Sequence, residues 1–497
     1  MLRKISTIGF LTVVVALMMP LSSVAGPAKP ENEAAKLLMT ATESHDRLQA
    51  AQAAADSAFN ALRVSVGAWY PTMSFSAGIG RERFEKPGPA NTNMSARQYT
   101  ARATQLLWDF GATNADIERA RLASIRADVS VERTRQELLL EGLSAYATLL
   151  KAQMVLKYAR QSEENIRRQT GLEEVRLREG YGFTTDVLQA KSQLAGAQAR
   201  RVASEEMVQV ALNRFQAFFG HVDINGTTLQ SLALPETTLP RRLEDALAGA
   251  RESNLRLQEL ALNVAAAREN ITATQGRSFY PRIEGVLERT VKDDYQGTAG
   301  RQNESVAKVQ LTLPFNLGFT ALNSVKQARA DAAAADSSLA DQERQVLEGV
   351  RNSWSRLQSA RQQSELLRDQ ATLAKGFLEV ARSERELGTR SLIDLLTGET
   401  TLINAQSDAA AAETDVALAG YQLLAAIGHL SYTDVRTRPV QAPDRKAARP
   451  AKPPRTTTPA PGRAGKTPPA PAPAAPTAPA PTAPAPAAPP PPAPAPQ

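Results

Sequence analysis

The chain has 497 residues, a formal net charge of +7, 5% aromatic residues and no cysteine. The absence of cysteine excludes disulfides, thiolate metal sites, a cysteine nucleophile and a lipoprotein anchor. Seven basic residues and no acid lie between residues 445 and 497, which leaves residues 1–444 neutral. A nucleic-acid-binding protein carries its positive charge on a folded face, whereas this charge lies in a Pro/Ala-rich segment. No nucleic-acid partner is therefore expected.

The N-terminus has the features of a secretory signal peptide. Two basic residues precede a mainly apolar run from Ile8 to Leu21, and small residues follow it up to Ala25. We predict a signal peptide over residues 1–25, cleaved after Ala25. A membrane anchor is the alternative, but the run is short and contains Pro20.

The rest of the sequence contains two internal repeats. Six short motifs recur in the same order at offsets of 207 to 210 residues. The pairs are Trp69-Tyr70-Pro71 with Phe279-Tyr280-Pro281, Asp109-Phe110-Gly111 with Asn316-Leu317-Gly318, Glu141-Gly142-Leu143 with Glu348-Gly349-Val350, Asp186-Val187-Leu188 with Asp394-Leu395-Leu396, Ala197-Gln198 with Ala405-Gln406, and Gly220-His221 with Gly428-His429. We predict a first repeat over residues 26–220, a periplasmic linker over 221–241 and a second repeat over 242–430.

Each repeat begins with a helical segment, 31–67 or 242–275, which a Tyr-Pro pair ends because proline disfavours helix in the residue before it. Two segments of alternating apolar and polar residues follow, which is typical of strands with one apolar face. We predict strand hairpins over residues 72–108 and 282–314. Their loops are expected at residues 86–93 and 293–300.

A helix of unusual length follows each hairpin. Residues 112–179 and 321–387 contain no proline, and about 68 residues at 1.5 Å each extend roughly 100 Å. In the first of them Leu139, Leu143, Tyr146 and Leu150 step by four, three and four, as coiled-coil packing requires. Glycine-containing turns then lead into shorter return helices, with turns at 180–182 and 388–390 and helices at 185–219 and 392–427.

Four strands per chain cannot close a membrane barrel, and open sheet edges are not stable in lipid. Three chains would supply 12 strands, an even number that suits a bacterial outer-membrane barrel. Eight aromatic residues lie where strand meets helix: Trp69, Tyr70, Trp108, Phe110, Phe279, Tyr280, Phe315 and Phe319. We interpret them as a girdle at the membrane interface. The alternative is that they cap an ordinary core where helix packs on sheet.

Three stretches carry a resemblance to a known family. They are Gly388-Thr389-Arg390-Ser391-Leu392-Ile393-Asp394-Leu395-Leu396, its counterpart Gly182-Phe183-Thr184-Thr185-Asp186-Val187-Leu188, and the strand end Leu311-Thr312-Leu313-Pro314-Phe315. Over about residues 31–430 the chain resembles the TolC family of outer-membrane factors. The resemblance implies a mainly α fold with a β-barrel portion. Three protomers would share a 12-stranded barrel in the outer membrane of a Gram-negative bacterium, and coiled-coil hairpins would continue it across the periplasm to a closed tip.

The resemblance also implies site residues at this tip. Arg390 matches an arginine that bonds to a Thr-Asp pair in the other half, which here is Thr185 and Asp186. Such an Arg–carboxylate bond is directional and a docking partner can break it. Asp394 matches an acid in a ring around the pore, where three copies would attract cations.

Two positions depart from the family pattern. Thr397 stands in place of a second ring acid, and Arg385 stands in place of a tyrosine before the turn. Cation selectivity is therefore expected to be weaker and the closing network different. For Asp186 and Asp394 the alternative role is to cap the helix that follows each turn.

No catalytic, cofactor or metal site is expected, because the three histidines (His45, His221 and His429) are far apart and no phosphate-loop or hydrolase motif is present. The favoured function is a passive export duct. It would receive substrates from a periplasmic adaptor and an inner-membrane ABC exporter or proton-driven pump, in type I protein secretion or multidrug efflux, with a preference for protein. The alternatives are a periplasmic coiled-coil adaptor or stalk without a barrel, and a secreted enzyme. Residues 431–497 are expected to form a disordered basic tail.

Overall fold

The computed structural model describes residues 33–85, 91–221, 229–315 and 317–438. The chain divides into two units, Met1–Val440 and Gln441–Gln497, and every feature below belongs to the first. The predicted signal peptide and the predicted tail beyond residue 438 lie outside the described residues.

Two helices precede each strand hairpin and two longer ones follow it. They are α1 (Glu33–Glu43), α2 (Asp46–Gly67), α3 (Ala112–Arg178) and α4 (Thr184–Phe219) in the first repeat, and α5 (Leu243–Ser253), α6 (Leu255–Phe279), α7 (Thr320–Glu386) and α8 (Leu392–Ile427) in the second. The predicted single helix at the start of each repeat is wrong, because it is broken at His45 and at Asn254. Both side chains accept N-cap hydrogen bonds from backbone N–H groups, so a new helix begins there.

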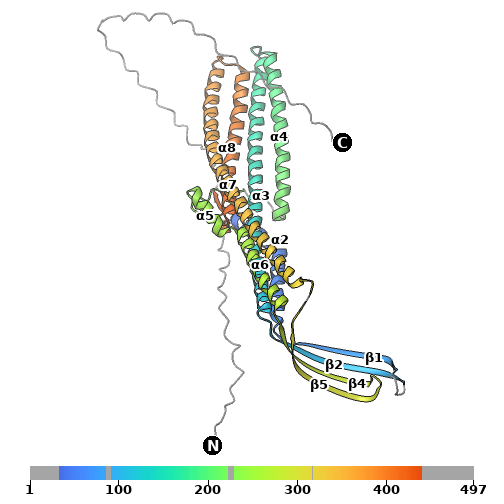
Figure 1. Cartoon of the computed structure of the whole chain (residues 1–497). Helices are drawn as coiled ribbons and strands as arrows, with labels where there is room; N and C mark the ends of the chain where they lie inside the picture. Colours follow the sequence, from blue (N-terminus) through green and yellow to red (C-terminus); the bar gives the residue numbers. More distant parts are fainter. Residues whose placement is uncertain (1–32, 86–90, 222–228, 316, 439–497) are drawn as a thin grey trace, which may run out of the picture. The chain divides into compact units, whose positions relative to one another are not determined.

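Four long antiparallel strands form one sheet in the order β1-β2-β4-β5 (Figure 1). They are β1 (Thr72–Phe84), β2 (Thr92–Trp108), β4 (Arg282–Tyr295) and β5 (Thr298–Thr312). Both predicted hairpins are confirmed, but the second loop is much shorter than residues 293–300. Tyr295 pairs with Thr298 across Gln296 and Gly297, whose φ angles of 53° and 73° are left-handed. A two-residue turn of that conformation matches the strand twist, so the strands continue to the turn.

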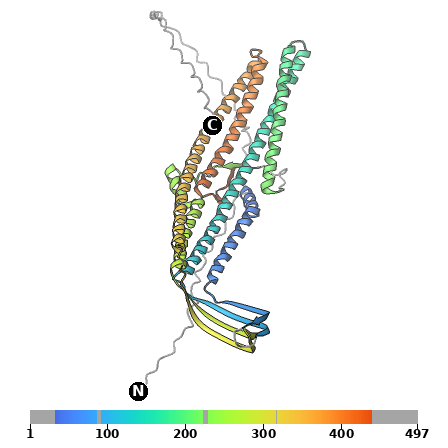
Figure 2. The same cartoon turned by 45° about the vertical axis from the view of Figure 1, so that its right-hand side comes forward.

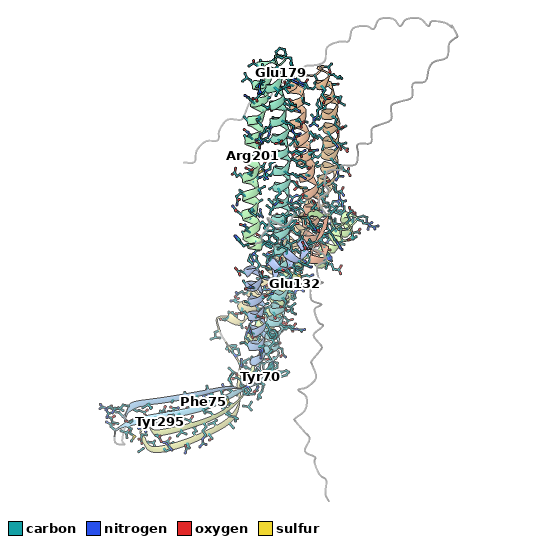
Figure 3. The ribbon with its side chains drawn as sticks, turned by 180° about the vertical axis from the view of Figure 1, so that it is seen from behind. Tyr70, Phe75, Glu132, Glu179, Arg201 and Tyr295 are labelled. Carbon is teal, nitrogen blue, oxygen red and sulfur yellow. The ribbon has the colours of Figure 1, made fainter. Side chains whose placement is uncertain are left out.

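The two long helical hairpins pack side by side. Helix α3 contacts α2, α4, α6 and α8, and α7 contacts α6 and α8. The α3–α4 and α7–α8 turns lie at the end of the helices away from the sheet (Figures 1 and 2). Figure 3 places Tyr70 where the sheet meets the helices and Glu179 at the far turn. None of the helices in the described ranges has a stretch that is long and apolar enough to cross a membrane.

The main core lies midway along the helices. Leu38 of α1, Tyr146 of α3, Phe215 of α4 and Tyr421 of α8 are all buried in it. A small second sheet closes this region, in which β3 (Ser231–Ala233) pairs with β6 (Arg436–Arg438).

The start of the predicted tail at residue 431 is wrong. A short 3-10 helix, η1 (Tyr432–Asp434), leads into β6, and Tyr432 is buried. The hydroxyl of Tyr421 donates to the Ala233 carbonyl at 2.8 Å and accepts from the Arg436 N–H at 3.0 Å. These contacts hold residues 431–438 on the folded body.

Candidate functional site at the helical tip

Both long hairpins reverse through turns of the same construction. Gly180 and Gly388 have φ angles of 85° and 77°, a region that glycine enters without strain. In each turn the next N–H reaches back to a helix carbonyl. Tyr181 donates to Arg176 at 3.2 Å, and Thr389 donates to Glu384 at 3.0 Å. The two turns are therefore compact helix ends with satisfied backbone groups.

The two turns differ where the candidate arginine stands. Arg390 occupies the position that corresponds to Gly182 in the first repeat. A Cβ atom on Gly182 would lie 2.6 Å from the backbone nitrogen of Leu177. No side chain fits there without moving the backbone, so only the second repeat can present an arginine at this point of the turn.

Arg385 links the two hairpins within one chain. Its Nη2 atom lies 3.0 Å from Glu173 Oε1 on α3 and 3.6 Å from Asp186 Oδ2 on α4. Its Nη1 atom donates to the Arg390 carbonyl at 3.1 Å. The Glu173 side chain is only 3% exposed, and Arg176 also bonds to it at 2.7 Å. One guanidinium therefore joins α7 to both helices of the other hairpin.

Arg390 itself pairs within its own turn. Its Nε atom lies 3.1 Å from Glu384 Oε2 and 4.0 Å from Asp394 Oδ2. Its guanidinium stacks over the Phe377 ring, 5.1 Å from the ring centre. Among the described residues of one chain, Arg390 makes no ion pair with Asp186. The expected link from Arg390 to Thr185 and Asp186 is therefore not made inside one protomer.

Both candidate acids lie in the first turn of a return helix. Asp186 is in the first turn of α4, where Thr185 is exposed, and Asp394 is in the first turn of α8. The helix dipole favours an acid at each position. The side chain that caps α8 belongs to Ser391, which accepts from the Asp394 N–H at 3.2 Å. The Asp394 side chain is 54% exposed.

A second polar layer lies next to the tip, and the sequence reasoning missed it. Glu399 of α8 is 1% exposed, yet its carboxylate bonds to Arg382 of α7 and accepts from Asn165 Nδ2 of α3 at 3.1 Å. The residues around it on α8, Leu395, Leu396 and Leu402, are buried. A glutamate on an otherwise apolar helical stripe was the available signal.

A third contact joins the helices of the first hairpin to each other. Lys191 Nζ of α4 lies 2.8 Å from Glu174 Oε1 of α3. The hydrogen bond from this ammonium holds the pKa of Glu174 below its ordinary value. The tip thus contains ion pairs both within and between the two hairpins.

The predicted aromatic residues do gather where the sheet meets the helices. Phe110 stacks on Tyr280 with ring centres 5.3 Å apart, and Trp108 meets Phe110 edge to face at 6.1 Å. Seven of the eight side chains are exposed: Tyr70, Trp108, Phe110, Phe279, Tyr280, Phe315 and Phe319. Trp69 is half-buried, and its Nε1 donates to Asn114 at 3.1 Å. Within one protomer these aromatics do not cap a buried core.

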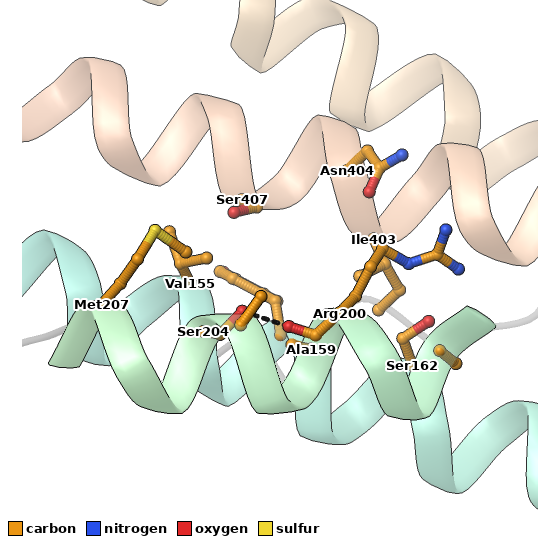
Figure 4. A pocket seen from close by; sticks show the side chains of 12 residues that line it. Val155, Ala159, Ser162, Arg200, Ser204, Met207, Ile403, Asn404 and Ser407 are labelled. Atoms are coloured by element: carbon orange, nitrogen blue, oxygen red, sulfur yellow. Dashed lines mark hydrogen bonds between the residues drawn. The ribbon is translucent and has the colours of Figure 1, made fainter. Parts of the chain in front are cut away.

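A cavity of about 250 Å³ lies between α3, α4 and α8 (Figure 4). Small and apolar side chains line most of it, and Arg200 is the charged residue of the lining. The Ser204 hydroxyl is already used, since it donates to the Arg200 carbonyl at 2.8 Å. The lining offers no pair of acid and base for catalysis.

The histidines lie where the helices begin or end. Gly220 and Gly428 end α4 and α8, so His221 and His429 follow helix C-termini, while His45 is the N-cap of α2. Within the described residues no three His, Asp or Glu side chains come together as metal ligands would.

The chain belongs to the family described as outer membrane efflux protein, whose model matches residues 37–221 and 246–429. There is one matched segment in each repeat. Its relatives include the outer membrane protein TolC of Vibrio cholerae, 25% identical over 405 residues, which are 81% of this chain and 92% of that protein. Another is the alkaline protease secretion protein AprF of Pseudomonas aeruginosa, 26% identical over 343 residues, which are 67% and 69% of the two chains.

Solved structures share the fold. The Campylobacter jejuni CmeC outer membrane channel has a TM-score of 0.71 at 12% identity and covers 83% of this chain and 91% of that one. The outer membrane protein VceC of Vibrio cholerae has a TM-score of 0.68 at 17% identity, with coverage of 80% and 96%. The resemblance to the TolC family is thus confirmed.

The protein is an outer-membrane efflux channel of a Gram-negative bacterium, with a helical part in the periplasm. The mainly α fold class is confirmed, and so is the expected location. The alternative of a coiled-coil stalk without a barrel is not supported, because both hairpins form one sheet with an exposed apolar face. The family consists of transport proteins, not enzymes.

Proposed function

We propose that three copies of the chain close into one duct, and a single observation carries this proposal. Among the described residues, the order β1-β2-β4-β5 leaves β1 and β5 without a partner on their outer edges. Large apolar side chains on both edge strands are exposed, among them Phe75 and Val309. Open edges are unstable in lipid. Three four-stranded sheets would remove every edge, with β5 of one copy pairing with β1 of the next.

The helices support the same closure. Contacts run in the order α4–α3–α8–α7, so α4 and α7 lie at the two sides of the protomer. Exposed apolar residues on α7 and at its C-cap are spaced seven apart: Leu366, Leu373, Val380 and Leu387. Leu188 and Val202 of α4 are exposed fourteen apart. A seven-residue apolar spacing is that of a coiled-coil seam, and α7 of one copy would pack on α4 of the next.

The aromatic residues at the junction would then form a ring at the periplasmic face of the membrane. Phe110 and Phe319 have φ angles of 57° and 56°, a region that is costly for residues with a Cβ. Each repeat has a phenylalanine at such a position, although glycine would adopt this φ angle with less strain. An interfacial role for the ring side chains accounts for that choice.

The tip would act as a gate with two kinds of link. Arg385, paired with Glu173 and Asp186, holds the hairpins of one protomer together. Arg390 would reach Thr185 and Asp186 of the neighbouring protomer, and three copies of Asp394 would make the entrance attract cations. Because ion pairs can be exchanged for new ones, a docking partner could open the tip.

The partners would be a periplasmic adaptor and an inner-membrane ABC exporter or proton-driven pump. They would supply the energy that a passive duct lacks. Protein is the favoured cargo, in type I secretion, because one relative is named as a protease secretion protein. Small toxic molecules are the other class. The domain limits follow from the same proposal, with a signal peptide over residues 1–25 and repeats over 26–220 and 242–430.

Single-channel recording in a planar bilayer tests the duct and its gate together. The purified wild type should give a low, cation-preferring conductance and run as a heat-sensitive trimer on a gel. Arg390→Ala should raise the conductance. An open wild type that ignores the substitution would keep the channel and reject the gate. No conductance and no trimer would reject the duct.

A further inference from the structure

The register of the sheet assigns each strand residue to one of two faces. Met73, Ala103, Leu287 and Ala307 are aligned across the four strands on one face. This is the apolar face that would contact lipid. On the opposite face Arg102 pairs with Glu288 at 2.5 Å, and Lys292 pairs with Glu304 at 3.0 Å. Acids of the polar face therefore neutralise Arg102 and Lys292 locally.

Arginines gather on the apolar face near the hairpin tips. By alternation this face carries five of them: Arg81, Arg83, Arg97, Arg289 and Arg301. Asp293 is the acid among the strand residues of the same face, and it pairs with Arg301 at 3.1 Å. Arg83 pairs with Glu85 at 2.8 Å.

The other three arginines, Arg81, Arg97 and Arg289, are exposed, and none of them forms an ion pair within the described part of the chain. Arg289 donates to Ser305 Oγ at 2.8 Å. An unpaired charge on a lipid-facing surface is expensive unless a counter-ion or a polar headgroup meets it. The three guanidinium groups therefore require an external partner.

These three arginines share a common place relative to the apolar band. Each lies two residues beyond a large exposed apolar side chain of its own strand, in the direction of the hairpin tip: Ile79, Tyr99 and Leu287. Arg97 on β2 is in register with Ile79 on β1, so Arg81 lies two residues closer to the hairpin tips than Arg97. Arg97 is also in register with Asp293 on β4, so Arg289 lies four residues further from the tips than Arg97. Strands of a barrel tilt by about 35–45°. At that tilt a level line shifts by about one residue from strand to strand, because neighbouring strands lie about 4.8 Å apart and each residue rises about 3.3 Å. Arg81 and Arg97 therefore come closest to one level, and Arg289 lies further in.

We propose that Arg81, Arg97 and Arg289 form a basic collar that binds the phosphate groups of anionic lipid in the outer leaflet. A guanidinium presents a planar fork of donors that matches phosphate oxygens. Arg81 and Arg97 lie beyond the last apolar residue of this face on β1 and β2, where the headgroups would begin, whereas Val291 lies two residues beyond Arg289 on β4. The other border of the band is aromatic, so the two leaflets meet different chemistry. The inference rests on the outer-membrane location and on hairpins that cross the membrane.

Native mass spectrometry of the full chain in detergent tests the collar, with bis-phosphorylated lipid A as the probe and phosphate-free lipid A as its comparison. The wild type should retain the phosphorylated probe in preference. A cation near a membrane surface contributes about 1 kcal/mol, so Arg289→Gln should weaken retention about fivefold. The triple variant Arg81→Gln/Arg97→Gln/Arg289→Gln should lose the preference. Lys308→Gln is the matched control, because Lys308 is an exposed cation on the opposite face.

Equal retention of both probes by the wild type would overturn the proposal, and so would equal losses in Arg289→Gln and Lys308→Gln. The single variants keep the test valid if the triple variant fails to assemble. A wild type that forms a heat-sensitive trimer and conducts, but shows no phosphate preference, would reject the collar and leave the duct intact.

Discussion

Arg385 and Glu173 form a largely buried ion pair between α7 and α3, with Nη2 and Oε1 3.0 Å apart. Arg385 was noted in the sequence as a departure from the family pattern, where a tyrosine is expected. A neutral phenol has one O–H donor and no charge, whereas this guanidinium contacts Glu173, Asp186 and the Arg390 carbonyl. Ion pairs therefore contribute more to holding this tip together than they would with a tyrosine at position 385.

Removing this arginine should loosen the tip. We expect Arg385→Ala to raise single-channel conductance severalfold, because α7 loses its link to α3 and α4 while Glu173 keeps only Arg176. Arg368→Ala is the control, since Arg368 of the same helix, α7, forms an exposed ion pair with Glu413 of α8. Arg385→Lys, which keeps the positive charge, should retain part of the low conductance. Similar conductance in all variants would show that the link is structural and does not gate.

Glu399 should stabilise the packing of the two hairpins. We expect Glu399→Gln to lower the free energy of unfolding by about 1–3 kcal/mol, because a buried charge-assisted bond to Arg382 is lost. Glu413→Gln, in an exposed pair, should cost less than about 1 kcal/mol. Thermal unfolding followed by circular dichroism compares them. Equal losses would mean that burial of Glu399 gives it no special weight.

The two equivalent glycines of the repeat should respond in opposite directions to alanine. A Cβ on Gly142 would lie 2.6 Å from the Phe218 ring and 2.8 Å from Leu38, whereas a Cβ on Gly349 meets open space. Alanine is favoured over glycine in a helix by about 1 kcal/mol. Gly349→Ala should therefore raise the unfolding temperature and Gly142→Ala should lower it. Each variant serves as the control for the other, and a rise in both would contradict the close packing at Gly142.

Tyr421 should make the protein sensitive to alkali. Burial raises the pKa of Tyr421 to about 12, above the ordinary value of 10.0. The folded state then holds the proton more tightly than the unfolded state, so this stabilisation is complete below about pH 10 and falls as the pH rises towards 12. Tyr421→Phe should flatten this alkaline loss. It should also cost about 1–3 kcal/mol at neutral pH, because the Arg436 N–H and Ala233 carbonyl lose their partner. An unchanged alkaline limb would point to other groups.

Much of the fold could be predicted because its signals are long. Pro71 and Pro281 end the helices before the hairpins, and proline-free stretches mark α3 and α7 within one residue of their observed bounds. Strand alternation over many residues gave both hairpins. The short elements β3 and β6 have three residues each and carry no usable period. Their pairing depends on the buried hydroxyl of Tyr421, a contact that no local pattern indicates.

For the tip, the sequence indicated a position in the fold but not which residues pair there. The repeated Asp186 and Asp394 follow the two glycine turns that end the long helices. The partner of Asp186 within one chain is Arg385 and not Arg390, because that pairing depends on how α7 lies against α3 and α4. Steric exclusion at Gly182 explains why the second repeat alone carries the arginine.

The anchoring of Arg436 by Tyr421 also has a practical use for labelling. It fixes the backbone just before Arg438 against β3, beside the core midway along the helices. A fluorescent or affinity module fused after Arg438, in place of the residues that follow, would start at that level in each copy, far from both the tip and the membrane. Such a label would report assembly in cells while both ends of the duct stay unobstructed.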